Sequence, residues 1–143
     1  MATRSRIGIE CPDGSVRSIY CHNDGYPSHN GKILNDHYTT REKVEELIEL
    51  GDISVLKKDV TAPEGASHTF DRPYEDVTVA YCRDRGEEYS APRKDASLAK
   101  FLKSDYEEYG YVFTLNNEWV VCQRYASGAI EFEPLTDVLE SGE

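Results

Sequence analysis

The residues best suited to chemistry gather in two short segments of this chain, 18–27 and 77–86. In the first segment, Cys21 and His22 place a thiol next to an imidazole. A cysteine nucleophile needs an imidazole that faces its sulfur, but neighbouring residues on the expected β-strand point to opposite faces. His29 or His37 could supply the base instead, although neither accompanies a nucleophile elbow or an oxyanion loop. The sequence therefore favours binding over catalysis and predicts no catalytic residue.

The same cysteine and histidine residues are the candidates for a metal site. Cys21, His22, His29 and His37 form the one cluster of potential ligands in the sequence. A structural zinc site needs four such ligands at recognisable spacings, and the spacing here matches none of the usual patterns. We therefore expect neither a metal nor another cofactor.

Two arginines mark the second segment. Arg83 and Arg85 follow a run of β-branched residues, and side chains at i and i+2 of an extended chain project from the same side. Two guanidinium groups placed in this way could hold a phosphate or a carboxylate, while tyrosines stack on a nucleobase. The residues of this hypothetical nucleotide site are His22, Asp24, Tyr26, Tyr81, Arg83 and Arg85.

A simpler interpretation competes with the nucleotide site. Arg83 and Arg85 stand among Asp84, Glu87 and Glu88, and surface ion pairs between such neighbours are common. The sequence favours ion pairing over phosphate binding. It also contains no glycine-rich phosphate loop, which argues against an ATPase.

The chain is strongly acidic, with 16 Lys and Arg against 27 Asp and Glu and a formal net charge of -11. A negative field repels the phosphate backbone, so direct and general binding to nucleic acid is not expected. The same field attracts a protein with a basic surface. The charge could also serve only to keep the protein soluble.

The acidic residues are concentrated in two places. One is the outer face of an expected helix, formed by Glu42, Glu45, Glu46 and Glu49 together with Asp52. The other is an acidic tail over 134–143, within a stretch that has no Lys or Arg after Arg124. Charged faces are usually only solvated. Mimicry of a nucleic-acid backbone is nevertheless a hypothesis, and it predicts a basic partner groove and binding that weakens with salt.

Hydrophobic segments typical of membrane proteins are missing from the sequence. No apolar run approaches the roughly 18–20 residues of a membrane span, and residues 1–6 lack the apolar stretch of a signal peptide. We expect no membrane association and a cytoplasmic location. The four cysteines form no C-x-x-C pair and are expected to be reduced thiols there.

Local patterns predict the elements that position these residues. Asp13 and Gly14 indicate a tight turn between strands at 6–10 and 16–22. Helices are expected over 31–38 and from Thr39 or Thr40 to residue 50, and of these two starts Thr39 has the capping-box spacing to Glu42. The buried face of the second helix, which Gly51 ends, comprises Val44, Leu47 and Ile48.

The second half of the chain is predicted from weaker signals. A short strand or turn at 52–56 leads into a long loop over 57–76 and then a central strand at 77–82. A helix is expected over 97–109, followed by a hairpin with strands at 111–115 and 119–125. A short strand at 129–133 and a short helix from Thr136 complete the prediction.

These elements together predict a single domain over 1–143 of the α+β class. We expect a mainly antiparallel sheet made from the N-terminal hairpin, the central strand and the C-terminal hairpin. About three helices should pack on it.

Several motifs also resemble a family of small, mostly uncharacterised phage and prophage proteins. The resemblance covers most of the chain and rests on the motifs SRIGI at 5–9, SIYCH at 18–22, DGYP at 24–27, HY at 37–38 and RDRGE at 83–87. In that family the residue after Cys-His is usually Trp, whereas this chain has Asn23. If that Trp packs in the core or stacks on a ligand, Asn23 does not supply the aromatic ring for it in this chain.

The resemblance implies a phage-encoded accessory protein that works inside a bacterial host cell. Such proteins often block host defences, similar to anti-CRISPR and anti-restriction proteins. Together with the acidic charge, this makes an inhibitor of a host defence protein or nucleic-acid-handling complex the first hypothesis. A binder that sequesters a nucleotide defence signal is the second, and a small hydrolase acting on such a signal is the third.

Overall fold

The computed structural model describes residues 3–89, 91–97, 101, 109–123 and 132–140. Within these residues one sheet has the strand order β4-β3-β2-β1-β6-β7-β8, and β5 pairs with β2 beside this path. The strands are β1 (Ser5–Glu10), β2 (Val16–Cys21), β3 (Ile53–Val55), β4 (Val79–Ala80), β5 (Arg93–Asp95), β6 (Tyr109–Phe113), β7 (Trp119–Gln123) and β8 (Phe132–Pro134). The helical segments are the π-helix η1 (Pro27–Gly31) and the α-helices α1 (Lys32–His37), α2 (Arg41–Glu49), α3 (Tyr81–Arg85) and α4 (Leu135–Glu140).

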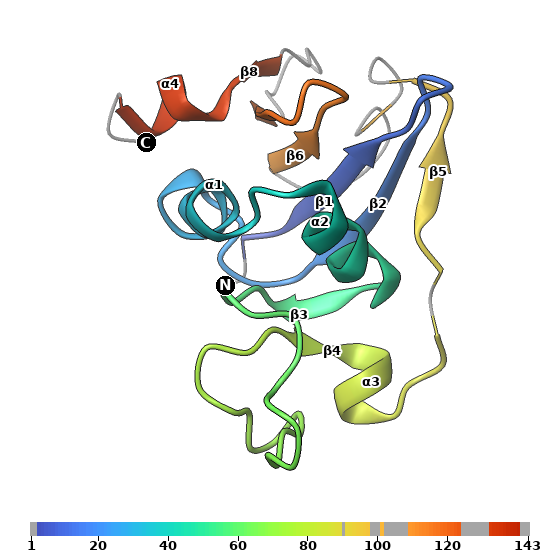
Figure 1. The fold of residues 1–143 in the computed structure, drawn as a ribbon, viewed down its shortest axis with the longest axis vertical. Helices are drawn as coiled ribbons and strands as arrows, with labels where there is room; N and C mark the ends of the chain where they lie inside the picture. The colour runs from blue at the N-terminus through green and yellow to red at the C-terminus, as the bar shows by residue number, and fades with distance from the viewer. Residues whose placement is uncertain (1–2, 90, 98–100, 102–108, 124–131, 141–143) are drawn as a thin grey trace.

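Most neighbouring strands in this sheet are antiparallel, and the expected α+β class is confirmed in broad terms. The parallel pairs, β1 with β6 and β2 with β3, were not predicted. Parallel neighbours need a long crossover connection. Between β2 and β3 that connection consists of η1, α1 and α2, which places α1 and α2 over one face of the sheet (Figure 1).

The predicted N-terminal hairpin is confirmed as β1 and β2, which pair along their whole length. Its turn depends on two residues. The Asp13 carboxylate accepts hydrogen bonds from the N–H of Ser15 at 3.0 Å and from its hydroxyl at 2.5 Å. Gly14 adopts a φ of 87°, which glycine tolerates without steric cost. The hairpin fixes which face of the sheet each side chain of β2 occupies.

Helix α2 forms as expected, and Thr40, the second of the two predicted starts, is its N-cap. The capping box at Thr39 is wrong, because the hydroxyl of Thr40 accepts the N–H of Lys43 at 3.3 Å. Gly51, with a φ of 77°, follows the end of the helix as predicted. The helix expected over 31–38 is divided in two, since Pro27 opens the π-helix η1 that precedes α1.

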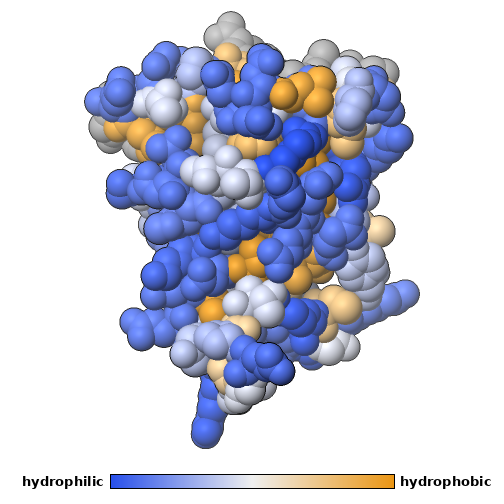
Figure 2. Space-filling model, in the orientation of Figure 1, coloured by the Kyte–Doolittle hydropathy of each residue, from blue (hydrophilic) through white to orange (hydrophobic). Residues whose placement is uncertain are grey.

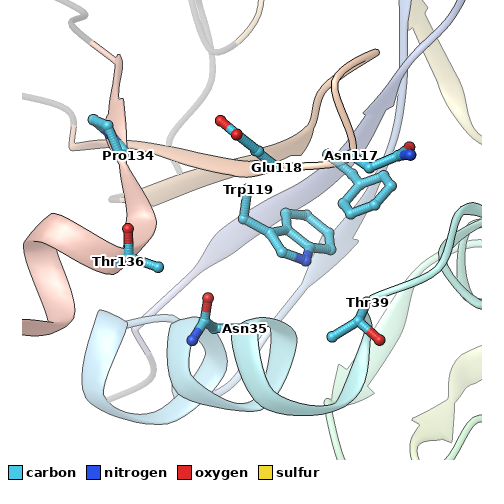
Figure 3. A pocket seen from close by; sticks show the side chains of 8 residues that line it. Asn35, Thr39, Asn117, Glu118, Trp119, Pro134 and Thr136 are labelled. Atoms are coloured by element: carbon cyan, nitrogen blue, oxygen red, sulfur yellow. The ribbon is translucent and has the colours of Figure 1, made fainter.

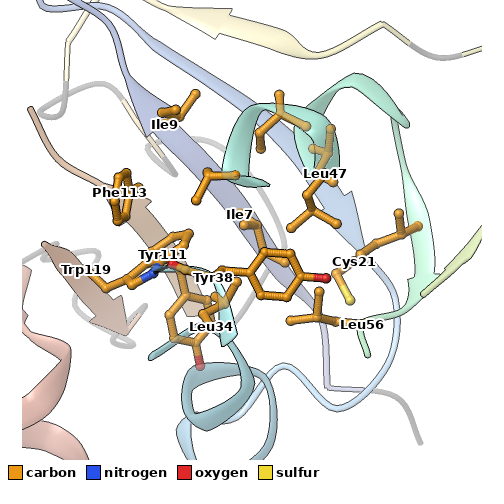
Figure 4. Packing of buried hydrophobic residues seen from close by; sticks show 14 of the residues in the cluster. Ile7, Ile9, Cys21, Leu34, Tyr38, Leu47, Leu56, Tyr111, Phe113 and Trp119 are labelled. Atoms are coloured by element: carbon orange, nitrogen blue, oxygen red, sulfur yellow. Dashed lines mark hydrogen bonds between the residues drawn. The ribbon is translucent and has the colours of Figure 1, made fainter. Parts of the chain in front are cut away.

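The main hydrophobic core lies between these helices and the sheet (Figure 4). The strands contribute Ile7, Ile9, Ile19, Cys21, Tyr111 and Phe113, and the helices contribute Leu34, Val44, Leu47 and Ile48. In a smaller cluster, the side chains of Val16, Val112 and Cys122 alternate along the strands with those of the main core and so lie on the other face of the sheet, where Phe101 packs with them. Burial stabilises the fold by roughly 25 cal/mol per Å² of apolar surface, so both faces contribute.

Three buried aromatic side chains also donate hydrogen bonds to backbone carbonyls. The Tyr38 hydroxyl donates to the carbonyl of Lys57 at 2.7 Å. The Tyr111 hydroxyl donates to Gly25 at 2.6 Å. The indole N–H of Trp119 donates to Tyr38 at 2.8 Å. Burial raises the pKa of both tyrosines above its ordinary value, so their hydroxyls remain donors.

The central strand predicted over 77–82 is wrong in length and position. β4 contains only Val79 and Ala80 and lies at the edge of the sheet. Helix α3 follows directly, because the Asp84 carboxylate accepts the N–H of Ala80 at 2.7 Å and Gly86 closes the helix with a φ of 81°. The β-branched residues of this run, Val77, Thr78 and Val79, are nevertheless buried. Val77 forms an isolated bridge with Asp59 of the 57–76 segment.

The C-terminal hairpin is confirmed as β6 and β7, with a register that pairs Phe113 with Trp119. Most of the helix predicted over 97–109 lies outside the described residues, and Tyr109 belongs to β6 rather than to a helix. Most of the strand predicted over 129–133 also lies outside them, whereas β8 begins at Phe132. Helix α4 begins at Leu135, one residue before the predicted start, and β5 was not predicted.

Replacing Tyr38 by Phe should lower the free energy of unfolding by about 0.5–1.5 kcal/mol, because the carbonyl of Lys57 loses one of its two donors and keeps only the hydroxyl of Thr78 at 3.2 Å. Urea denaturation followed by far-UV circular dichroism measures the change. Tyr74→Phe is the matched control, since Tyr74 is 42% exposed and its hydroxyl makes no hydrogen bond within the described residues. Equal stability of both variants would show that the Tyr38 bond contributes nothing.

Candidate functional site

The strand alternation expected at Cys21 and His22 is confirmed. Cys21 is fully buried in the core, and burial raises the pKa of its thiol to about 11. The amide of Asn30 donates a hydrogen bond to its sulfur at 3.3 Å. His22 instead shares a hydrogen bond with the hydroxyl of Tyr20 at 2.8 Å, on the opposite side of the strand. The thiol is a protonated core group and the imidazole does not face it.

The other histidines considered as partners are also accounted for. His29 in η1 shares a hydrogen bond through Nδ1 with the side-chain oxygen of Asn30 at 2.9 Å. His37 is exposed at the end of α1. Among the described residues, no three His, Cys, Asp or Glu side chains are grouped so that they could hold a metal ion.

Arg83 is bound into the fold rather than presented to a ligand. Its Nε and Nη2 donate to the two carboxylate oxygens of Asp84 at 2.8 and 2.9 Å. Its Nη1 donates to the carbonyl of Val60 at 2.6 Å, and Nη2 also donates to Thr78 at 2.7 Å. A guanidinium group with these partners has few donors left for a phosphate.

Arg85 takes a different direction from Arg83. Because α3 is a helix, the two side chains are about 200° apart around its axis and do not form the fork expected of an extended chain. Arg85 pairs with Glu87 at 3.2 Å and lies over the ring of Phe70 at 4.8 Å. The ion-pair interpretation of both arginines is confirmed.

Asp84 and His68 form the centre of a buried polar network. The N–H of Tyr74 donates to Nδ1 of His68 at 2.9 Å, so the ring hydrogen lies on Nε2, which is 3.1 Å from both the carboxylate of Asp84 and the carbonyl of Thr78. Burial of Asp84 raises the pKa of its carboxyl, but hydrogen bonds from Arg83 and Ala80 outweigh this and leave the pKa below its ordinary value. The network attaches the 57–76 segment to β4 and α3.

The remaining residues of the hypothetical nucleotide site fall into separate groups. Tyr81 packs on Phe70 with 5.9 Å between ring centroids. Tyr26 lies at the start of η1, where its hydroxyl is 3.4 Å from the carboxylate of Asp24 and its ring is edge-on to His29. No hydrogen bond or ring contact between described residues joins Tyr26 to Tyr81.

The acidic face of α2 is present as expected. At 100° per residue, its four glutamates lie within one stripe opposite the buried residues of the helix, and all four are exposed: Glu42, Glu45, Glu46 and Glu49. Figure 2 views the molecule from the side of α1 and α2, and hydrophilic side chains cover most of this face. The stripe is therefore available to a partner.

The members of this acidic face are not equivalent. Glu49 forms a salt bridge with Arg17 at 2.6 Å, and the carboxylate of Asp52 accepts the N–H of Tyr20 at 3.0 Å. Glu42, Glu45 and Glu46 make no hydrogen bond or salt bridge to any residue that the structure describes. We call these three residues the acidic stripe. Their carboxylates are exposed and are not fixed by a neighbouring side chain of the described residues.

A pocket that sequence reasoning missed lies beside α1, with a volume of about 330 Å³. Figure 3 shows Asn35 and Thr39 on one side of it, Pro134 and Thr136 on another, and Trp119 between them. Its walls come from the end of α1, the β6–β7 hairpin and the start of α4. These segments are far apart in the sequence, so no local pattern could reveal the pocket.

Comparison with known proteins identified no relative of this chain. A scan against protein-family models and searches of curated proteins and solved structures found no match to the chain.

Within the described residues, no helix has the length and apolar composition needed to cross a membrane.

Asp84→Asn should lower the free energy of unfolding at neutral pH by about 1–3 kcal/mol. The substitution removes the negative charge that faces Arg83, and the new side-chain NH2 group is a donor placed against the donors of Arg83 and Ala80. Urea denaturation measures this change. Glu87→Gln removes a charge from an exposed ion pair and should change stability by less than about 0.5 kcal/mol.

The Asp84 effect should also depend on pH. A carboxyl whose pKa is lowered by folding stabilises the protein above its ordinary pKa of 3.8, and this contribution disappears as the pH falls through the lower folded value. The stability difference between wild type and Asp84→Asn should therefore shrink below the ordinary pKa. A difference that stays constant under acid conditions would contradict a charged Asp84 in the folded protein.

Proposed function

We propose that this protein is a phage-encoded accessory protein that binds a basic surface of a host defence protein or nucleic-acid-handling complex and inhibits it. It acts in the cytoplasm of the bacterial host, as anti-CRISPR and anti-restriction proteins do. The observation that carries the proposal is the acidic stripe, whose three exposed carboxylates form no salt bridge or hydrogen bond with a described residue, in a chain with a net charge of -11. The motif resemblance to phage proteins supports the biological setting.

The helix that carries the stripe is held firmly in place. Its opposite face is buried in the core, and Thr40 caps its N-terminus. Lys43 donates from Nζ to the carbonyls of His37 and Lys58 at 2.8 and 2.7 Å. Arg41 donates to the carbonyl of Glu10. The backbone of such a helix needs no reorganisation when it meets a cationic surface, so the ordering cost of binding falls on the glutamate side chains.

The groups that could have served catalysis support a binding role as well. The Cys21 thiol has a raised pKa and lies in the core, and Arg83 is occupied by Asp84 and by backbone carbonyls. Binding through exposed charges acts mainly on the rate of association and on the choice of partner. It is screened over about 10 Å at 0.1 M salt.

The test begins with capture of partners from bacterial lysate on the immobilised protein and identification by mass spectrometry. Affinity for a captured protein is then measured by surface plasmon resonance at low and high salt. Reversal of the whole stripe, with Glu42→Lys, Glu45→Lys and Glu46→Lys combined, should lower the affinity about tenfold or more and remove most of its salt dependence.

A control with the same change in net charge separates the stripe from the overall field. Glu64, Asp71 and Glu75 are exposed acids in the 57–76 segment, and reversing them to Lys should leave the affinity within about twofold. Equal losses in the two triple variants would mean that net charge, rather than the stripe, drives binding. Unchanged affinity in the stripe variant would refute binding through α2.

A further inference from the structure

Three separate hollows lie around α1 and share lining residues, and together we call them the groove. The pocket of about 330 Å³ shares Asn35 and Thr136 with a hollow of about 210 Å³. That hollow shares Lys32 and Asp36 with a third one of about 170 Å³, which extends toward η1. α1 forms one wall of the groove, and α4 and the β6–β7 hairpin form the other at its deeper end.

The deepest part of the groove has an apolar floor. Trp119 and Phe113 form it, packed edge to face with 5.2 Å between their ring centroids. The indole N–H of Trp119 is already bonded to the carbonyl of Tyr38, so the floor offers carbon surface rather than a donor. A ligand must therefore bring a flat or aliphatic portion to this floor.

The rim of this pocket carries oxygen acceptors. The side chain of Glu118 is exposed there and makes no hydrogen bond or salt bridge to a described residue. Asn117 and Asn35 contribute amide groups, and Asn35 uses only its nitrogen, in a long contact with Asp36. Thr39 and Thr136 add hydroxyls. The arrangement suits a ligand with several donors above a nonpolar stem.

The charge of the groove favours a cation. Lys32 is paired with Asp36 at 3.2 Å, and Glu140 adds a carboxylate at the middle hollow. The guanidinium of Arg41, nearby in sequence, points away to the carbonyls of Glu10 and Thr114. Since Glu118 is the one charged residue lining the 330 Å³ pocket in the described part of the chain, a phosphate would be repelled and a positive group attracted.

We infer that this pocket binds an arginine side chain of the basic partner, an inference that rests on the proposed function. A guanidinium group is planar and weakly hydrated, packs on aromatic surface and donates two parallel hydrogen bonds to a carboxylate. Glu118 would take that pair while the floor takes the aliphatic stem. The six residues of α1 span about 9 Å, which accommodates roughly three residues of an extended chain around the arginine.

The single tryptophan of the chain makes a specific probe possible. The indole N–H resonance of Trp119 is followed by ¹⁵N-correlated NMR during titration with acetyl-Gly-Arg-Gly-amide. We expect a saturable shift. The same peptide with citrulline, which keeps the shape and removes the charge, should bind at least tenfold more weakly. Absence of a shift, or equal binding of the two peptides, overturns the inference.

Glu118→Gln provides the matched variant, because it keeps the size of the side chain and removes its charge. It should weaken binding of the arginine peptide at least fivefold, while Glu64→Gln, an exposed acid of the 57–76 segment, should not change it. Equal effects of both variants would indicate general charge attraction and would overturn the pocket assignment. Unchanged chemical shifts elsewhere in the spectrum of Glu118→Gln verify that the fold is intact.

The two proposals fail in different ways. If the arginine peptide leaves Trp119 unaffected but reversal of the acidic stripe abolishes partner binding, the pocket inference is wrong and the proposed function stands. If the peptide binds through Glu118 while the stripe variant retains full affinity for the partner, binding through α2 is wrong and the pocket alone remains a recognition site. Loss of partner affinity in both Glu118→Gln and the stripe variant supports both.

Discussion

The helical layer of this protein is joined to the sheet by aromatic side chains that bury their rings and donate one hydrogen bond each. Tyr38, Tyr111 and Trp119 donate to backbone carbonyls, of which those of Gly25 and Tyr38 belong to buried residues and that of Lys57 to a half-buried one. An unpaired carbonyl at such a position would cost about 1–3 kcal/mol. The aromatic residues therefore fix position as well as filling volume, because each bond restricts how far a loop or helix can move from the core.

The surfaces discussed above follow from this attachment. The bond from Trp119 to the carbonyl of Tyr38 sets the separation between β7 and the end of α1, and the groove occupies the space that remains. The acidic stripe has a related origin. The same regular helix that turns Val44, Leu47 and Ile48 into the core must turn the residues between them outward. The groove and the stripe thus both belong to the layer of α1 and α2.

The sequence was informative where structure depends on neighbouring residues. The Asp13-Gly14 turn, the outward glutamates of α2 and the separation of Cys21 from His22 all follow from local geometry. Prediction failed where a distant or competing contact decided the outcome. The carboxylate of Asp84 captures the N–H of Ala80 and starts a helix in a β-branched run, and Thr40 caps α2 in preference to its neighbour Thr39. The groove combines three segments that only the folded chain brings together.

The position of β1 has a consequence for how the chain is made. β1 lies in the middle of the sheet, between β2, which follows it at once, and β6, where Ser5 pairs with Tyr109. During synthesis the first hairpin can close early, whereas the other edge of β1 must wait until nearly the whole domain has left the ribosome. An open strand edge is a template for wrong pairing, and contacts between such distant residues slow folding. In the nascent chain this edge of β1 therefore stays open to wrong pairing until β6 has been made.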